Sequence, residues 1–230
     1  FTYEDPDVWL VDLDQDKRID VMRAATTQYY IYFNREEGWS AGPDRVLEPL
    51  NYGIPLLASD PRVQLSDMNG DRMQDIVYVS DDQVVYFPSK GLGDFDAENV
   101  VQMANSPALL GRPDEALLTD VNGDALTDII RVNRFSVSLW LNQAAAGFGP
   151  EIILANTPEF IAGETELRLA DMNGDGATVH FTVANQQARD VLEQSMPRLR
   201  EMLAQQGVQL GDTSVQQQSS GQQQNRYAAN

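Results

Sequence analysis

Short apolar runs recur along the first three quarters of the chain, and polar turn residues separate them. Runs that are rich in β-branched and aromatic residues and are bounded by such turns are typical of strands. In each unit, one run follows an aspartate-rich loop, a second run comes shortly afterwards, and a turn with glycine and an aromatic residue follows. The expected strands include residues 75–79, 128–132, 30–34, 84–88 and 137–142, and the turns are residues 38–39, 93–95 and 147–149.

The aspartate-rich loop occurs four times, and its first residues are Asp12, Asp67, Asp120 and Asp171, which are 55, 53 and 51 residues apart. A period near 50 residues with several strands per unit is typical of propeller blades or a β-solenoid, whose units must pack on one another. We therefore predict a mainly β fold, a partial β-propeller of about three to three and a half blades. Closed rings need about four to eight blades, so we expect an open arc with an exposed apolar end.

Oxygen-bearing side chains stand at positions 1, 3, 5 and 9 of the first three loops and at positions 1, 3 and 5 of the fourth, counted from the first aspartate of each loop. Alternate residues of a curling loop can point inward together, and calcium is a hard cation that prefers oxygen ligands. The spacing therefore predicts Ca²⁺ sites, completed by water and by a backbone carbonyl near position 7. The predicted ligands are Asp12, Asp14, Asp16 and Asp20; Asp67, Asn69, Asp71 and Asp75; Asp120, Asn122, Asp124 and Asp128; Asp171, Asn173 and Asp175; and the carbonyls of Arg18, Met73 and Leu126.

Two alternatives compete with this interpretation. An EF-hand needs a glutamate at position 12 and a following helix, whereas Arg23, Tyr78 and Arg131 stand there and strands are expected, so an EF-hand is rejected. The loops could instead be metal-free Asx-turns, and this is favoured for the fourth copy, where Val179 replaces the last aspartate.

The sixth position of the loops weakens the expected affinity. A sharp turn usually requires glycine there, but the first three copies have Lys17, Arg72 and Ala125. If these residues are left-handed, each costs roughly 1–2 kcal/mol.

Charge and composition exclude several functions. The net charge is −19, and all of the excess acid lies in residues 1–176, which repels nucleic acid and suits a protein that binds cations. There is no cysteine, one histidine (His180) and no apolar run of the ~20 residues that a membrane span needs. The acids lie in repeating loops and form no singular pair such as a glycosidase uses, so we expect no enzymatic activity.

The loops resemble FG-GAP/VCBS repeats of integrin-type propellers. Residues 60–71 and 139–150 resemble more closely the propeller of the insecticidal toxin-complex B component and its SpvB-like relatives. The resemblance covers residues 1–176 and implies a secreted scaffold and docking surface, with other toxin-complex subunits as protein partners and no catalytic residues. Lys17, Arg72 and Ala125 depart from the glycine usual in that family.

The pattern changes after residue 176. Residues 178–183 alternate like a strand, and an apolar stripe from Ala188 to Leu203 predicts a helix with Asn185 as its N-cap, a kink at Pro197 and an end at Gly207. Residues 208–210 are expected to form a short last strand. Residues 212–230 are rich in Gln, Ser and Asn, so they are expected to be disordered.

This part, residues 177–220, resembles the C-terminal domain of the flagellar hook-length control protein, through residues 179–183, 188–193, 196–203 and 206–211. The resemblance implies an alternative function, a switch of export substrate specificity that contacts the flagellar export gate. The fourth loop stops before its last ligand at the point where this segment begins. We therefore divide the chain into residues 1–176, 177–211 and 212–230 and interpret it as a chimera joined at 176/177.

Overall fold

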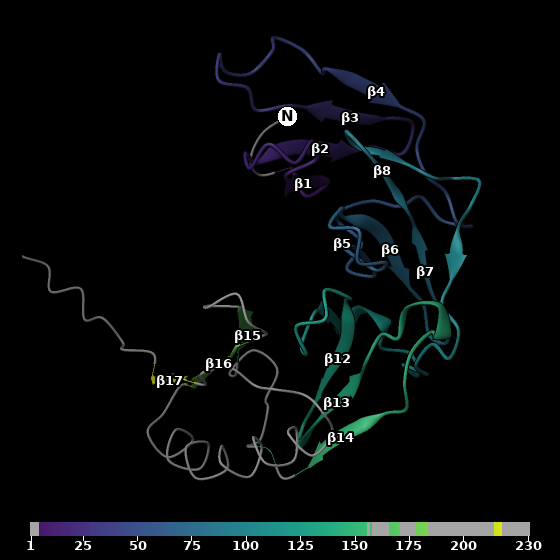
Figure 1. Ribbon diagram of the computed structural model, residues 1–230, viewed down its shortest axis with the longest axis vertical. Coiled ribbons are helices and arrows are strands. Elements are labelled where there is room, and N and C mark those ends of the chain that lie inside the picture. The colour runs from purple at the N-terminus through teal and green to yellow at the C-terminus, as the bar shows by residue number, and fades with distance from the viewer. Residues whose placement is uncertain (1–4, 156, 158–165, 171–177, 184–213, 218–230) are drawn as a thin grey trace, which may run out of the picture.

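The computed structural model describes residues 5–155, 157, 166–170, 178–183 and 214–217 (Figure 1). Three antiparallel four-stranded sheets follow one another along the chain, and we name them blades 1, 2 and 3. The described part also contains two short 3-10 helices, η1 (Pro113–Glu115) and η2 (Ala144–Ala146). The prediction of a mainly β, partial propeller is therefore confirmed.

Each blade is an up-and-down meander whose first two strands are joined by an aspartate-rich loop. Blade 2 differs from the others because the β8–β9 hairpin interrupts the chain before its fourth strand. Blade 1 contains β1 (Val8–Val11), β2 (Asp20–Ala24), β3 (Tyr29–Tyr32) and β4 (Arg45–Leu47); blade 2 contains β5 (Val63–Ser66), β6 (Asp75–Val79), β7 (Val84–Phe87) and β10 (Val101–Gln102), with β8 (Ser89–Gly91) and β9 (Asp94–Phe95) inserted; blade 3 contains β11 (Ala116–Thr119), β12 (Asp128–Asn133), β13 (Ser136–Trp140) and β14 (Ile152–Ala155).

The blades pack face to face, and strand alternation explains how blade 2 serves both neighbours. Successive side chains of a strand point to opposite faces of the sheet. In β6, Ile76 joins a buried cluster with blade 1, whereas Val77 and Val79 join a second cluster with blade 3. Neither face of this sheet could be left in water, which explains the nearly continuous apolar sequence of β6 and β7.

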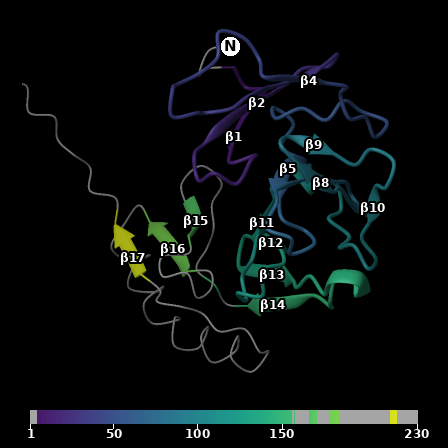
Figure 2. The ribbon, with the colours of Figure 1, turned by 45° about the horizontal axis from the view of Figure 1, so that its top comes forward.

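The three blades follow a curved path with their first strands toward the inside (Figures 1 and 2). The aromatic turns differ in exposure between the blades. Phe95 packs between blades 1 and 2 and Phe148 between blades 2 and 3, but Trp39, at the same place in blade 1, is 47% exposed. Likewise Leu65 packs against the first cluster, whereas its counterpart Leu10 is 57% exposed. The face of blade 1 that points away from blade 2 therefore has the exposed apolar positions that the sequence predicted.

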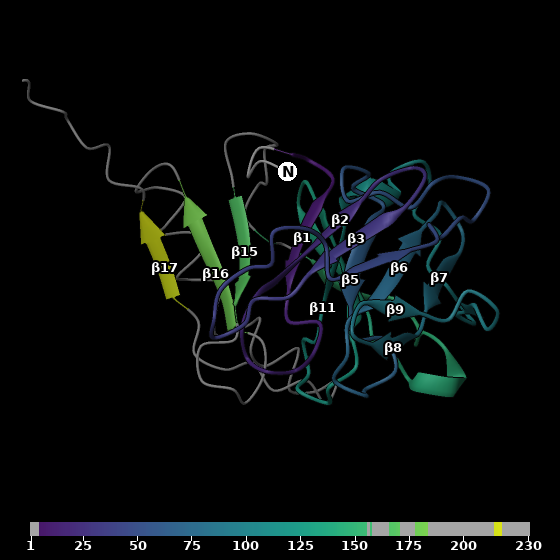
Figure 3. The same ribbon diagram turned by 90° about the horizontal axis from the view of Figure 1, so that it is seen from above.

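A fourth sheet contains β15 (Glu166–Ala170), β16 (Thr178–Val183) and β17 (Ser214–Gln217), which lie side by side in Figure 3. β15 and β16 are antiparallel and flank the fourth loop, as the first two strands of each blade flank theirs. The chain junction predicted at 176/177 therefore lies between two paired strands. The strand predicted at residues 178–183 is confirmed.

The structure departs from one expectation for the C-terminal segment at four residues. Residues 212–230 were expected to be disordered, but Ser214–Gln217 form β17, which pairs parallel with β16. Pairing uses backbone N–H and C=O groups, so a polar, glutamine-rich strand can add to a sheet edge. The helix predicted over residues 188–203, its cap Asn185 and the strand predicted at 208–210 lie outside the described residues.

Candidate metal centre

The first three loops (loop 1, residues 12–20; loop 2, residues 67–75; loop 3, residues 120–128) curl in the same way. Positions 4 and 6 have left-handed backbone in each. Glycine occupies position 4 in loops 2 and 3, but Gln15 in loop 1 has φ 63°. At position 6, Lys17, Arg72 and Ala125 have φ of 70°, 69° and 69°. All three therefore carry the strain that the sequence suggested, and loop 1 carries it twice.

The aspartate at position 1 closes each loop by accepting hydrogen bonds from the backbone. One oxygen accepts the N–H of position 6, with N···O distances of 2.9 Å for Lys17, 2.7 Å for Arg72 and 2.9 Å for Ala125. The other oxygen accepts an N–H from position 4 or 5. These bonds satisfy backbone donors in a tight turn, as an Asx-turn does.

The aspartate at position 9 is fully buried and joins two distant points of its blade. In blade 2, one oxygen of Asp75 accepts the N–H of Met68 at 3.0 Å and the other accepts the N–H of Ser89 at 2.8 Å. Asp20 bonds Leu13 and Asn34 and Asp128 bonds Val121 and Asn142 in the same way, at 2.8–3.0 Å. We call this arrangement the carboxylate staple, because it fixes the loop to the end of the third strand. This role was not predicted from the sequence, where the available signal was the recurrence of aspartate at the first residue of a buried strand.

Burial raises the pKa of the staple carboxyls. Removal from water, together with the nearby loop carboxylates, raises the pKa of Asp75 to about 6 and that of Asp128 to about 7, although the two backbone N–H donors act in the opposite direction. The pKa of Asp20 is raised for the same reasons. A cation in the loop would favour the ionised form of all three.

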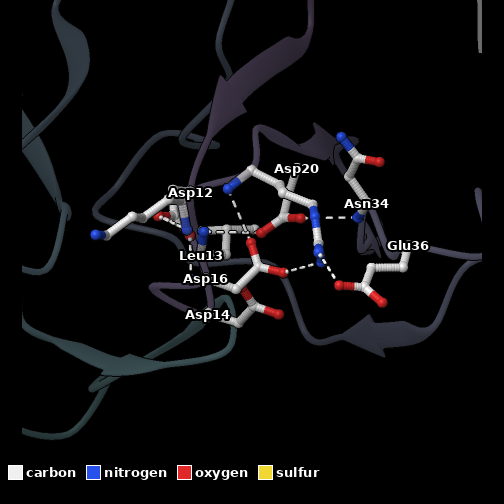
Figure 4. A network of polar contacts seen from close by, with 9 residues as sticks. Asp12, Leu13, Asp14, Asp16, Asp20, Asn34 and Glu36 are labelled. Carbon is white, nitrogen blue, oxygen red and sulfur yellow. Dashed lines mark hydrogen bonds and ion pairs between the residues drawn. The ribbon is translucent and has the colours of Figure 1, made fainter.

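Loop 1 brings three of its predicted ligands together. One carboxylate oxygen from each of Asp12, Asp14 and Asp20 lies within 4.8 Å of the other two (Figure 4). Oxygens that bind one calcium ion at about 2.4 Å lie at most about 4.8 Å apart, so the donor set fits this cation. Within the described residues, no other set of three acidic side chains meets this criterion.

The fourth predicted carboxylate of loop 1 points elsewhere. One oxygen of Asp16 accepts the backbone N–H of Arg18 at 2.8 Å, and the other accepts the Arg18 guanidinium at 2.8 Å. The guanidinium also contacts Glu36 at 3.1 Å. Asp16 is not among the three carboxylates that converge.

Loops 2 and 3 hold their predicted ligands in a different arrangement. The side-chain amide of Asn69 donates to Asp71 at 3.0 Å, and that of Asn122 donates to Asp124 at 3.0 Å. The backbone N–H groups of Met73 and Leu126 donate to the same aspartates, at 2.8 and 2.9 Å. An oxygen-only shell in these loops would require the amide groups to turn. The fourth-loop candidates Asp171, Asn173 and Asp175 lie outside the described residues.

The next blade braces each of loops 1 and 2. The carbonyl of Leu13 accepts the N–H of Leu92 at 2.8 Å, and the carbonyl of Met68 accepts the side-chain amide of Asn142 at 3.0 Å. Thr127 of blade 3 also donates its backbone N–H to the carbonyl of Asp67 at 3.0 Å. Order in one loop is thus coupled to the interface between two blades.

Comparison with solved structures supports the arc of blades. A chain of the Photorhabdus luminescens Tc holotoxin pore superposes with a TM-score of 0.64 and 26% identity over 77% of this chain. An Agrocybe aegerita lectin that recognises non-reducing terminal N-acetylglucosamine gives a TM-score of 0.55 with 20% identity over 74% of this chain, which shows the fold alone. The chain spans 8% of the toxin chain and 44% of the lectin chain.

Sequence comparison gives a second, separate relation. A family model described as flagellar hook-length control protein FliK matches residues 162–224. The match begins before the junction expected at 176/177 and includes all three strands of the fourth sheet. No curated protein sequence matches the chain. Among the described residues, we find no helix with the length and apolarity to cross a membrane.

Proposed function

We propose that this chain is a calcium-binding, non-enzymatic β-propeller module that acts as a scaffold in a secreted, toxin-complex-like protein. The convergence of Asp12, Asp14 and Asp20 in loop 1 carries the calcium part of the proposal. The similarity to a Tc holotoxin chain supports the scaffold part, with other toxin-complex subunits as partners.

Electrostatics explains why a cation would favour this loop. Two unit charges at about 4 Å repel by about 1 kcal/mol in bulk water and by about 4 kcal/mol at an effective dielectric constant of 20. Three carboxylates within 4.8 Å of one another experience this repulsion pairwise. A bound divalent cation would replace this repulsion by attraction between the ion and each carboxylate. A cation that binds the folded state and not the unfolded state would also raise the melting temperature.

Calorimetric titration of calcium into chelator-treated protein tests the metal, together with the melting temperature with and without calcium. We expect binding heat and a higher melting temperature, and a weaker response in the Asp14→Asn variant, which copies the asparagine of loops 2 and 3. Asp82→Asn removes an equal charge from an exposed turn and is the matched control. Neither heat nor a change in melting temperature in the wild type would remove the calcium claim.

Binding of the chain to immobilised toxin-complex subunits tests the scaffold part of the proposal. A docking module should be retained by at least one of these subunits. Failure to bind any of them would refute this assignment. We include no catalysis in the proposal, because the acids lie in repeated turns whose oxygens bind backbone N–H groups.

The family match at residues 162–224 favours one second candidate, a regulator of flagellar export specificity. Retention of the full chain by the cytoplasmic domain of the export gate would support it, and absence of retention would exclude it. Sequencing the native locus across residues 175–177 decides whether both segments belong to one natural protein.

A further inference from the structure

Arg18 distinguishes loop 1 from the two sister loops. It stands at position 7, where loop 2 has Met73 and loop 3 has Leu126. Its guanidinium forms ion pairs with Asp16 at 2.8 Å and with Glu36 at 3.1 Å. The Glu36 side chain is 86% exposed, so the contact with Asp16 is the better defined of the two.

Both oxygens of Asp16 are engaged by the same residue. The backbone N–H of Arg18 binds one oxygen and its guanidinium binds the other. Asp14, two residues earlier, has no such cation and joins the converging group with Asp12 and Asp20. Among the four predicted carboxylates of loop 1, Asp16 is the one that is paired with an arginine, and it is the one outside the converging group.

The sister loops show which oxygen is at stake. In loops 2 and 3, the second oxygen of the position-5 aspartate accepts a neutral amide, from Asn69 to Asp71 and from Asn122 to Asp124. Loop 1 has Asp14 at position 3, which has no donor to offer when ionised. Arg18 supplies the missing donor, and unlike the amides it carries a positive charge.

We propose that Arg18 is a tethered counter-ion that competes with calcium for Asp16 and thereby sets the cation affinity of loop 1. This inference rests on the proposed function. Recruitment of Asp16 to the ion requires its contact with the guanidinium to open, and the positive charge beside the site also repels an incoming cation. For an exposed ion pair and a charge a few ångströms away, replacement of Arg18 should tighten binding about three- to tenfold.

The test compares three variants of the full chain. Arg18→Met copies loop 2, Arg18→Lys keeps the charge but loses the planar fork, and Arg112→Met removes an exposed, ion-paired arginine far along the sequence. Calcium is titrated while backbone amide NMR signals of each loop are followed, so that each loop gives its own affinity. The Arg18 Nε–H signal of the wild type is followed in the same titration.

We expect tighter binding at loop 1 in Arg18→Met, an intermediate affinity in Arg18→Lys, and no change in Arg112→Met. In the wild type, the Arg18 Nε–H signal should shift as loop 1 fills. Equal loop 1 affinities in the wild type and Arg18→Met would overturn the counter-ion role while calcium binding stands. If no loop of any variant binds calcium, the proposed function fails, and this inference fails with it.

Discussion

Replacement of Asp75 by asparagine should destabilise the protein even when no metal is present. Asp75 is fully buried at the start of β6 and accepts backbone N–H groups from Met68 and Ser89 on separate oxygens. Asparagine has nearly the same shape but only one acceptor oxygen. Its NH₂ group would face one of the two N–H donors and leave it without a partner.

Two opposing contributions set the size of this destabilisation: the loss of hydrogen bonding and the gain from no longer burying a charge. A buried donor without a partner costs about 1–3 kcal/mol, and a hydrogen bond to a charged group contributes about 1.5–3 kcal/mol. The neutral amide also avoids the burial of charge that raises the pKa of Asp75 to about 6, and this offsets part of the loss. We expect a net loss of about 1–3 kcal/mol in the free energy of unfolding.

The assay is thermal unfolding in excess chelator at pH 7.5, followed by circular dichroism. In a domain of this size, each kcal/mol shifts the melting temperature by roughly 2–4 °C, so the Asp75→Asn variant should melt about 2–12 °C lower. The exposed Asp82→Asn should stay close to the wild type. If the two variants melt together in chelator, the staple contributes nothing, and the aspartate matters only as a metal ligand.

The remaining predictions concern pH and backbone strain. Without metal, the folded-state pKa of Asp128, about 7, lies above its unfolded value, so this group stabilises the fold fully below about pH 4 and loses that contribution as pH rises through about 7. The melting temperature should therefore fall more between pH 5 and 7.5 in the wild type than in Asp128→Asn, and an equal fall in both proteins would contradict this. Lys17→Gly removes strain of roughly 1–2 kcal/mol at φ 70° but adds the unfolded-state freedom of glycine, so unfolding should become about 0.5–1 kcal/mol less favourable, and a lower urea midpoint would refute it. A Cβ at Gly147 would overlap the backbone of Ala104, whereas one at Gly38 meets open space at a similar positive φ, so Gly147→Ala should melt several degrees below Gly38→Ala; equal melting temperatures would contradict the close approach.

The repeat made the fold predictable, because each unit has the same need for apolar strands that pack against the neighbouring unit. Strands at 75–79 and 84–88 were expected from apolar runs and are observed as β6 and β7. The outer strands are short and partly exposed, and Val101–Gln102 forms its strand only through pairing with β7, so the local sequence carries little signal for it. The tail strand Ser214–Gln217 has a single apolar residue in its sequence and pairs with a strand more than 30 residues away.

The sequence predicted the candidate site as one set of equivalent ligands. In the structure, these residues have different roles because their surroundings differ. Positions 5 and 9 both hold aspartate in all three loops, and the loop spacing treats them alike. Position 9 starts a buried strand, so the carboxylate of Asp20 accepts backbone N–H groups at two points of the blade. Position 5 lies at the exposed tip of the turn, where the side chain of the aspartate can accept different donors. In loop 1, Asp16 accepts a hydrogen bond from a guanidinium.

This division makes the staple and the ion-binding role separable in principle. The staple oxygens of Asp20 bond Leu13 and Asn34, yet one of its oxygens still lies within 4.8 Å of Asp12 and Asp14, because a carboxylate oxygen has lone pairs beyond those that two N–H donors use. Calcium would therefore add to an existing contact and would not replace it. Since the carbonyl of Leu13 is in turn bound by Leu92 of blade 2, an ion in loop 1 would stiffen the interface between blades 1 and 2 through covalently adjacent atoms. Any calcium-dependent gain in melting temperature should consequently be smaller in a variant whose blade 1–blade 2 interface is already loosened.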